Sequence, residues 1–244
     1  PTMRKLAIIM TALALGAPAA FAAEGGTALW QQWHAGNELG DRASLQRGAR
    51  NFLNYCAGCH SLKYVRYQRV GEDLGIPADI MKANLVPPGA KITDYVLTAM
   101  PASLANASFG IVPPDLSLIT RSKGSDYVYQ FLKTFYLDPK AATGTNNLAL
   151  PGTAMPHVLS DLQGLQRAVF DKDGRFGKFE TDVAGQQSAA EYDSFVRDTV
   201  NFLEYAGEPA KLSRATIGVW VVLYLLLFTA LAWLLKQEYW KDVR

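Results

Sequence analysis

The chain has few of the residues that bind metals or form disulfides, with two cysteines and three histidines among 244 residues. Cys56 and Cys59 belong to one short motif, so no cysteine remains for a structural disulfide elsewhere, and the cysteine count identifies no oxidising compartment. A structural zinc site needs four ligands, mostly Cys or His. His34 and His157 are the only histidines outside the motif. The composition therefore argues against zinc.

The chain also lacks an excess of charge of either sign, because 24 Lys and Arg residues oppose 22 Asp and Glu residues. Removing residues 1–22 would take away Arg4 and Lys5 and no acidic residue, which would bring the formal net charge from +2 to zero. A protein without a strong positive field has no long-range attraction for nucleic acid. We therefore expect no nucleic-acid partner.

The feature that is present is the run Cys56-Ala57-Gly58-Cys59-His60. This C-x-x-C-H spacing is the attachment signature of c-type haem, in which both thiols add to the haem vinyl groups. Two thioether bonds one helical turn apart hold one edge of the porphyrin, so that His60 can bind the iron as the proximal ligand. A thioredoxin-like redox pair or a disulfide scaffold would not need the adjacent histidine, and half of a zinc site would need two further ligands. The motif predicts one covalently attached haem c.

The N-terminus carries the pattern of an export signal. Arg4 and Lys5 precede an apolar run over residues 6–17, and small residues follow, ending with an A-x-A sequence at residues 20–22. This order of basic, apolar and small-residue regions predicts a secretory signal peptide over residues 1–22. As a membrane anchor, the apolar run would be too short for a hydrocarbon core of about 30 Å.

A second apolar run, without a charged residue, spans residues 215–235. As a helix rising 1.5 Å per residue it would be about 31 Å long, which is enough to cross a bilayer. Trp220 and Trp233 can lie at the two interfaces with water. A core helix of a globular domain would show a polar face over such a length. We expect one transmembrane anchor over residues 211–235.

Basic residues are almost balanced on the two sides of this run, so the export signal decides the orientation. Residues 23–210 should form the haem domain outside the cytoplasm. Residues 236–244 should form a cytoplasmic tail.

Hydrophobic periodicity predicts a mainly α-helical domain between signal and anchor. One helix should begin near Asp41 and deliver the haem cysteines, and another should begin at a capping box formed by Ser188 and Glu191. Between them the pattern predicts loops with short helical pieces over residues 61–91, a short helix over 92–100, an amphipathic helix over 126–137 and a small hairpin over 170–179.

An iron that only passes electrons needs both axial positions filled, and methionine is the ligand that raises its potential. Outside the signal, the methionines are Met81, Met100 and Met155. Met100 and Met155 both stand in T-A-M-P tetrapeptides, but Met155 follows Gly152 in a non-helical loop where a turn can aim the thioether at the haem. Met100 ends the apolar stretch over residues 92–100 and is expected in the core. His157 is the remaining alternative, although the intervening proline would aim it differently. Met155 is therefore the predicted second ligand.

These residues together resemble the cytochrome c1 family, the haem subunits of cytochrome bc1 complexes. C-x-x-C-H alone occurs in many cytochromes, whereas its combination with P-P-D-L-S, a late methionine loop and a C-terminal anchor is specific. The style of the C-terminal tail is similar to that of proteobacterial members. The matching stretches cover nearly the whole chain and comprise residues 45–48, 56–61, 113–117, 151–156, 198–209 and 238–243.

The resemblance implies a cytochrome c fold with insertions, with His60 and Met155 as axial ligands. The family binds the haem propionates through a basic residue shortly after P-P-D-L-S and through a nearby tyrosine. By register from that motif, Lys123 stands where the family has arginine, and Arg121 lies two positions earlier. The choice between these two bases stays open. The cofactor-binding residues implied in this region are Pro114, Arg121, Lys123 and Tyr127.

The resemblance also implies respiratory electron transport as the function. The haem domain, in the periplasm and anchored to the bacterial inner membrane, would pass electrons from a Rieske iron–sulfur protein to a soluble or membrane-tethered c-type cytochrome. It would dock to cytochrome b within a dimeric complex and contact membrane lipid, and it would have no quinol-oxidising site of its own. A membrane-anchored haem enzyme or gas sensor with an open iron position is the competing hypothesis, and binding of Met155 to the iron separates the two.

Overall fold

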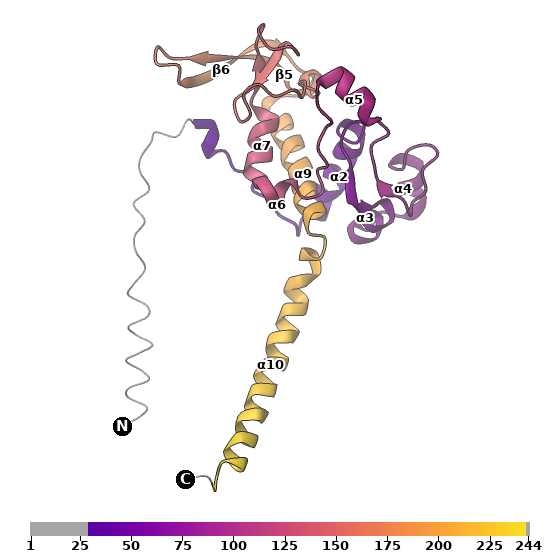
Figure 1. Ribbon diagram of the computed structural model, residues 1–244, viewed down its shortest axis with the longest axis vertical. Helices are drawn as coiled ribbons and strands as arrows, with labels where there is room; N and C mark the ends of the chain where they lie inside the picture. Colours follow the sequence, from indigo (N-terminus) through magenta and orange to yellow (C-terminus); the bar gives the residue numbers. More distant parts are fainter. Residues whose placement is uncertain (1–28, 243–244) are drawn as a thin grey trace.

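In the computed structural model, which describes residues 29–242, the chain forms a head carried on one long C-terminal helix (Figure 1). Strands within this range form three two-stranded antiparallel sheets, and most other ordered segments are helical. The expectation of a mainly α fold with one C-terminal membrane helix is confirmed. The predicted signal peptide lies outside the described residues. In chain order the elements are η1 (Leu29–Gln32), α2 (Arg42–Tyr55), β1 (Leu62–Arg66), α3 (Tyr67–Leu74), α4 (Ala78–Asn84), β2 (Tyr95–Val96), α5 (Ala102–Phe109), α6 (Ile119–Lys123), α7 (Ser125–Lys133), β3 (Phe135–Leu137), β4 (Thr145–Asn147), α8 (Ser160–Gln163), β5 (Gly164–Phe170), β6 (Phe176–Ala184), α9 (Ala189–Gly207) and α10 (Lys211–Tyr239).

Helix α2 forms where the periodicity predicts it. The side chain of Asp41 caps its N-terminus by accepting a hydrogen bond from the backbone N–H of Ser44 at 3.0 Å. One face, which includes Leu45, Ala49 and Phe52, is completely buried. The helix therefore presents an apolar face to the core and ends directly before the haem motif.

Helices α2 and α9 pack against each other at the centre of the head, although they come from its two ends. Arg47 on α2 makes two hydrogen bonds to the carboxylate of Asp198 on α9, at 2.6 and 2.9 Å. The close approach of the two helices depends on Gly48, because a Cβ atom at this position would lie 2.0 Å from the backbone oxygen of Asp198. Only glycine permits the two backbones to approach this closely.

Helix α9 begins at the predicted capping box. Ser188 Oγ accepts from the backbone N–H of Glu191 at 3.3 Å, and the Glu191 carboxylate accepts from the backbone N–H of Ser188 at 2.8 Å. The helix then buries one side in the core, including Val196, Val200 and Phe202. The predicted start and the predicted helical repeat are both confirmed.

A polar cluster joins α7 to α9. Asp193 accepts hydrogen bonds from Lys133, Tyr129 and Arg197, the last at 2.6 Å. Burial disfavours the charged carboxylate, but these donors outweigh burial and lower the pKa of Asp193 to about 2. The cluster therefore holds a carboxylate that stays charged in all but strong acid.

Residues 33–38, which we call the N-terminal strap, are tied to the same two helices. Asp126 of α7 accepts hydrogen bonds from the His34 ring and from the backbone N–H of Ala35, both at 2.8 Å. Arg197 of α9 donates to the backbone carbonyls of the same two residues, at 2.8 and 2.6 Å. His34 is thus a mostly exposed residue that fastens the strap.

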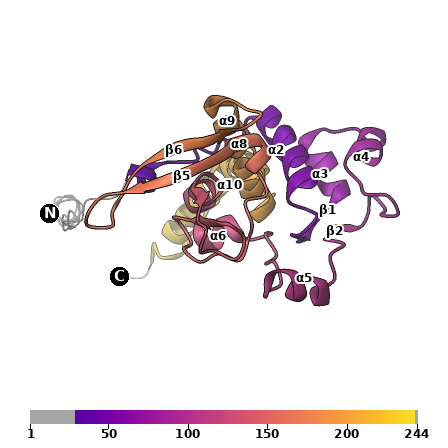
Figure 2. The same ribbon diagram turned by 90° about the horizontal axis from the view of Figure 1, so that it is seen from above.

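The predicted hairpin is present and is longer than expected. β5 and β6 pair from Gly164 opposite Ala184 up to Phe170 opposite Phe176, and the hairpin projects from the head in Figure 2. Asp171 closes the turn by accepting hydrogen bonds from the backbone N–H groups of Asp173 and Arg175. Charged residues at the tip mark the turn, but the sequence gives a weaker signal for the paired strands behind it.

Helix α10 leaves the head and carries the apolar run. Residues Thr216–Tyr239 are long and apolar enough to cross a membrane, and none of the most apolar part is buried by the head. The helix continues past the expected anchor end at residue 235. Ion pairs hold its first turn to the head, with Lys211 on Glu204 at 2.7 Å and with Arg214 on Glu208.

Two predicted elements differ in the structure. Residues 92–100 form no helix, because Val96 is buried as part of β2 and pairs with Leu62 of β1. The helix expected over residues 126–137 ends at Lys133, and β3 follows. Asn147 of β4 donates to the backbone carbonyl of Phe131 at 2.7 Å, so a carbonyl in the last turn of α7 is bonded to a strand. In both places a distant strand overrides the local helical pattern.

Candidate haem-binding site

The C-x-x-C-H motif forms a tight turn on the end of α2. The backbone N–H groups of Cys56 and Ala57 both donate to the carbonyl of Phe52, at 2.8 and 3.0 Å, which continues the last turn of the helix. The N–H groups of Cys59 and His60 then donate to the carbonyl of Cys56, at 3.1 and 2.9 Å. Both cysteines are free thiols and are half-buried. The turn therefore places the two thiols and the imidazole on one compact loop.

His60 is buried, and its ring is oriented by one hydrogen bond. Nδ1 lies 2.7 Å from the backbone oxygen of Pro114, and because a carbonyl only accepts, Nδ1 must carry the proton. The lone pair is therefore on Nε2, the atom that can bind a metal. Burial lowers the pKa of His60, and the bond to Pro114 and the charge of Asp115 oppose this only in part. The ring is neutral at pH 7, as a metal ligand must be.

The P-P-D-L-S segment is held against residues 56–61, which we call the attachment loop, and against β1 by further hydrogen bonds. The backbone N–H of Leu116 donates to the carbonyl of Ser61 at 2.9 Å, and the backbone N–H of Lys63 donates to the Asp115 carboxylate at 2.9 Å. Asp115 also accepts from the backbone N–H of Ser117 at 3.0 Å. The predicted cofactor residue Pro114 thus contacts His60, the predicted proximal ligand, through its backbone.

A segment that our sequence reasoning missed also lies on the attachment loop. Thr98 Oγ1 donates to the carbonyl of Gly58 at 2.7 Å, and the backbone N–H of Thr98 donates to Ser61 Oγ at 2.9 Å. Met100, two residues later, is half-buried and is not in the core, so its expected placement at the end of a core helix is wrong. The repeated T-A-M-P tetrapeptide was the signal that could have drawn attention to Thr98.

Met155 lies half-buried in an irregular loop between β4 and α8. Gly152 turns this loop with φ 76°, and its N–H donates to the side chain of Asn146 at 2.8 Å. The backbone N–H of Met155 donates to Thr153 Oγ1 at 3.3 Å. The hydrogen bond to Asn146 therefore fixes the loop to β4, as a non-helical turn of the expected kind. The assignment of Met155 as the second ligand stays a prediction.

His157, the alternative second ligand, lies in a buried aromatic environment. Its buried ring stacks parallel on Phe135, with the ring centres 4.8 Å apart. Burial lowers the pKa of His157 to about 4, against the opposing effects of Gly164 and Gln163. The ring is therefore a neutral imidazole packed against Phe135 of β3.

The structure separates the two bases that follow P-P-D-L-S. Arg121 pairs with Glu208 at the end of α9, at 3.0 Å, and so belongs to the junction with α10. Lys123 lies with its ammonium 5.9 Å from the centre of the Tyr127 ring. Tyr127 is half-buried, stacks on Phe131, and has its pKa raised by burial. Lys123 and Tyr127 are thus brought together, whereas Arg121 is turned to another partner.

The residues on this loop fit haem c by their chemistry. Two free thiols lie on one turn, and the next residue is a neutral, buried imidazole whose outer nitrogen carries the lone pair. Among the described residues, no group of three or more His, Cys, Asp and Glu residues could hold a bare metal ion. The donor set therefore suits a covalently held porphyrin and not a simple metal site.

Similarity to known proteins shows the family of the chain. A sequence model described as the Cytochrome C1 family matches residues 33–243. The chain belongs to the cytochrome c1 family. Membership implies a haem cofactor, and it confirms the resemblance drawn from P-P-D-L-S and the other stretches.

Individual relatives cover most of the chain. A protein named cytochrome c1 from Allochromatium vinosum is 48% identical over 99% of this chain and 100% of the relative. A protein named cytochrome c1 from Rhodospirillum rubrum is 29% identical over 95% of this chain and 94% of the relative. A protein named ammonia monooxygenase gamma subunit from Nitrosomonas europaea is 41% identical over 83% of this chain and 85% of the relative.

One solved structure, a chain of a hyperthermophilic respiratory complex III, is similar over 100% of this chain and 99% of its own length. Its TM-score is 0.40 and its sequence identity is 19%. At that level the match supports no conclusion about this chain.

Proposed function

We propose that this chain is the haem-carrying subunit of a bc1-type quinol–cytochrome c reductase. It accepts one electron from a Rieske iron–sulfur protein and passes it to a soluble or membrane-tethered c-type cytochrome, while quinol oxidation takes place in other subunits. The observation that carries the proposal is the buried ring of His60, which Pro114 orients beside two free thiols. Membership of the cytochrome c1 family supports it.

The chain's own contribution is to fix the orientation of the side chains proposed to bind the haem iron. Haem, when bound through Cys56 and Cys59, supplies a one-electron iron couple. Pro114 keeps the imidazole of His60 in a single tautomer and orientation. The loop fixed to β4 would supply the thioether of Met155 as the second protein ligand of the haem iron. With His60 and Met155 both serving as ligands, these two side chains would leave no position on the iron for small ligands.

Lys123 and Tyr127 hold the haem propionates in this proposal. The ammonium of Lys123 and the phenol of Tyr127 are close to each other, and within the described residues no ion pair engages Lys123. Arg121, the other candidate, is already paired with Glu208. Replacing Lys123 with Gln should therefore lower the reduction potential, because a positive charge near the iron is lost, whereas Arg121→Gln should leave the potential unchanged.

The proposed location follows from the two apolar segments. Residues 1–22 direct export, residues 23–210 form the haem domain in the periplasm, and residues 236–244 remain in the cytoplasm. The spanning part of α10 supports a membrane anchor, because it is uncharged over residues 216–235 and is not buried by the head. Cytochrome b and lipid are the proposed neighbours of this helix in a dimeric complex of the inner membrane.

The test of the proposal is the replacement of Met155 by Leu, which keeps size and apolarity and removes the sulfur. We expect this variant to retain covalent haem, to lose the long-wavelength absorption band of Met–iron coordination, and to bind carbon monoxide when reduced. Quinol-to-cytochrome c turnover by the complex should stop, because the potential falls. Met100→Leu is the matched control, since it makes the same change in the other T-A-M-P tetrapeptide and should have none of these effects.

The rival function is an enzyme or gas sensor with an open iron position. The observation that favours this rival function is the relative whose name is that of a monooxygenase subunit. Wild-type protein that binds carbon monoxide readily would support the rival. Protein that shows no haem stain after denaturation and solvent extraction would refute both functions, and loss of the band in Met100→Leu alone would refute the ligand assignment.

A further inference from the structure

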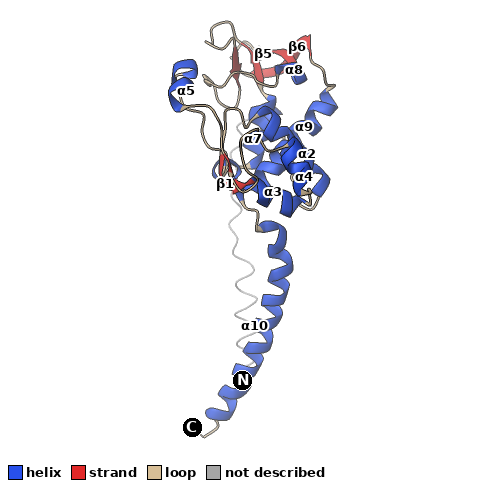
Figure 3. Ribbon diagram, turned by 90° about the vertical axis from the view of Figure 1, so that its right-hand side faces the viewer, coloured by secondary structure: helices blue, strands red, loops and turns tan. Residues whose placement is uncertain are grey.

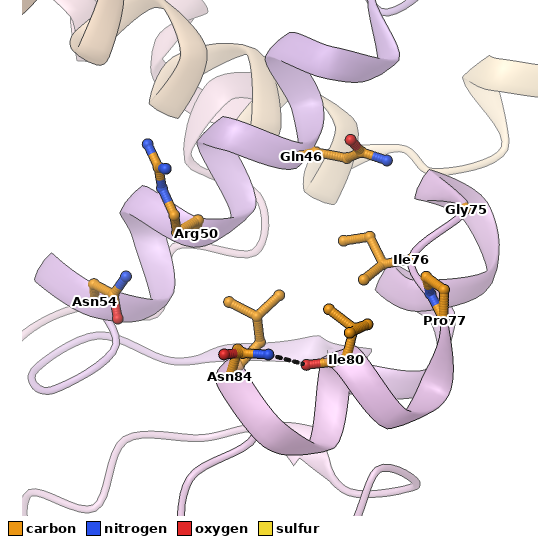
Figure 4. A pocket seen from close by; sticks show the side chains of 9 residues that line it. Gln46, Arg50, Asn54, Gly75, Ile76, Pro77, Ile80 and Asn84 are labelled. Carbon is orange, nitrogen blue, oxygen red and sulfur yellow. Dashed lines mark hydrogen bonds between the residues drawn. The ribbon is translucent and has the colours of Figure 1, made fainter.

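A groove on the head lies away from the haem site. It has a volume of about 570 Å³ and none of the candidate haem residues line it (Figure 4). One wall is the outer face of α2, where Gln46, Arg50 and Asn54 follow each other at intervals of four residues. The other wall is formed by α4 and the residues that flank it, with Ile76, Pro77, Ile80 and Leu85.

Both walls of the groove are fixed in place. Gln46 Nε2 donates to the backbone carbonyl of Leu74 at 2.8 Å and so ties α2 to the end of α3. Met81 of α4 is completely buried, and its side chain packs on Gly71 of α3. Asn84 donates to the carbonyl of Ile80 at 3.0 Å within α4. The groove is therefore preformed, and binding would not require its walls to move.

The charge of the groove is one-sided. Arg50 is the only charged side chain in the lining, and among the described residues no carboxylate forms an ion pair with it. Ile80 on the opposite wall is 47% exposed. An occupant must therefore bring a carboxylate to one wall and apolar side chains to the other.

An amphipathic peptide segment meets this demand better than a lipid does. The three polar groups on α2 extend over about 12 Å along the helix, at 1.5 Å per residue. An acyl chain lying in the groove would leave the Asn54 carboxamide and the Oε1 of Gln46 without partners, because within the described residues only the Nε2 of Gln46 is bonded, and this is costly once water is excluded. A peptide can pair them through its own backbone or side chains.

The position of the groove indicates where this peptide comes from. Along the long axis of the molecule, α3 and α4 lie in the half of the head nearer to α10, whereas α5 and the β5–β6 hairpin lie at the far end (Figures 1 and 3). A membrane-embedded subunit beside α10 can reach this half with a segment outside the bilayer.

We propose that the groove between α2 and α4 binds an acidic, amphipathic extramembrane segment of the membrane subunit that α10 accompanies. The carboxylate of this segment pairs with Arg50, and its apolar side chains cover Ile76 and Ile80. This inference rests on the proposed membership of the chain in a membrane complex. It adds a contact of the head to the contact that α10 makes within the membrane.

The experiment uses the full chain expressed with its complex. A photo-crosslinking phenylalanine analogue is placed at Ile80, in the groove, and as a control at Val183, which is exposed on the hairpin. We expect the Ile80 position to crosslink to a peptide of the co-purifying membrane subunit that contains Asp or Glu, and the Val183 position not to do so. Mass spectrometry identifies the crosslinked peptide.

A second measurement tests the charge. Arg50→Glu should reduce the Ile80 crosslink by about tenfold or more, because two like charges would replace an attractive pair. Arg50→Lys should retain most of the crosslink. Arg175→Glu reverses another exposed arginine, at the hairpin tip, and is the matched control that should change nothing. Covalent haem content should remain at the wild-type level in all three variants.

The outcomes distinguish this inference from the proposed function. A crosslink to lipid, a crosslink to a second copy of the chain, or no crosslink would overturn the inference while haem-loaded chain still co-purified with its membrane subunit. Chain that lacked covalent haem, or that co-purified with no membrane subunit, would refute the proposed function and this inference together.

Discussion

Replacing Gly48 by Ala adds one methyl group where α2 crosses α9. The new Cβ would lie 2.0 Å from the backbone oxygen of Asp198 and 2.7 Å from the Cβ of Phe202. Ordinary contacts of a Cβ atom begin at 3.4 Å, so the helices would have to separate locally by roughly 1.4 Å. Neither a backbone oxygen nor a Cβ atom can rotate away, and the clash can be relieved only by moving a helix.

The expected cost follows from this geometry. Inserting a methyl group into a well-packed core costs about 1–3 kcal/mol, and the upper end applies here because backbone must move. Alanine is a better helix former than glycine by about 1 kcal/mol, which offsets part of the cost. The net loss is therefore about 2 kcal/mol, or a fall of about 4–8 °C in the melting temperature for a domain of this size.

The assay is thermal unfolding of the haem-loaded, detergent-solubilised chain, followed by far-ultraviolet circular dichroism. Gly40→Ala is the control, because a Cβ at that position meets nothing within 4 Å, and we expect its melting temperature to stay within about 1 °C of wild type. An unchanged or higher melting temperature for Gly48→Ala would show that α2 and α9 do not approach each other as closely as described.

Three further predictions concern other parts of the chain. Ser188→Ala removes the capping box at the start of α9 and should lower the free energy of unfolding by about 1 kcal/mol, measured with denaturant. The pKa of Asp193 is about 2 in the folded chain, below its usual 3.8, so the stability it contributes is present above pH 4 and is lost as the pH falls toward 2. After allowance for solvent screening, this loss should be about 1–2 kcal/mol, and Asp193→Asn should flatten that part of the stability profile. Deletion of residues 212–244 should release a soluble, haem-loaded head.

Control variants and contrary results test these predictions. Ser188→Thr keeps a capping hydroxyl and should retain most of the stability, and equal losses in Ser188→Thr and Ser188→Ala would contradict the role of the cap. Asp182→Asn removes a carboxylate that pairs with Arg167 on the exposed hairpin, and it should leave the acid profile unchanged. A truncated chain that stays in the membrane after its partners are removed would contradict a single anchor.

Local signals in the sequence were sufficient for the elements that carry their own start and stop. The cap at Asp41 and the capping box at Ser188 each act within a few residues. The charge-free run before Lys236 is visible as one continuous stretch of sequence. The structure contains all three helices. The motif at residues 56–60 likewise depends on spacing alone, and the turn it forms is built from its own backbone hydrogen bonds.

Contacts between distant residues account for what the sequence did not show. Residues 92–100 have a helical pattern, but Val96 and Thr98 are fixed by Leu62 and Gly58, which lie more than thirty residues earlier. The choice between Arg121 and Lys123 was open in sequence because both follow P-P-D-L-S closely. Glu208, far along the chain, takes Arg121 and leaves Lys123 beside Tyr127.

In the export that we propose for this chain, the crossing of α2 and α9 also sets an order of events. Arg47 and Asp198, which pair across the crossing, are 151 positions apart. The N-terminal strap likewise depends on Arg197, a late residue that donates to the carbonyl of His34. If the chain crosses the membrane from its N-terminus as proposed, the head cannot close until α9 has emerged, immediately before α10 would halt translocation. We therefore expect the thiols of Cys56 and Cys59 to stay open to the attachment machinery for nearly the whole passage, and to be enclosed only when the last helix arrives.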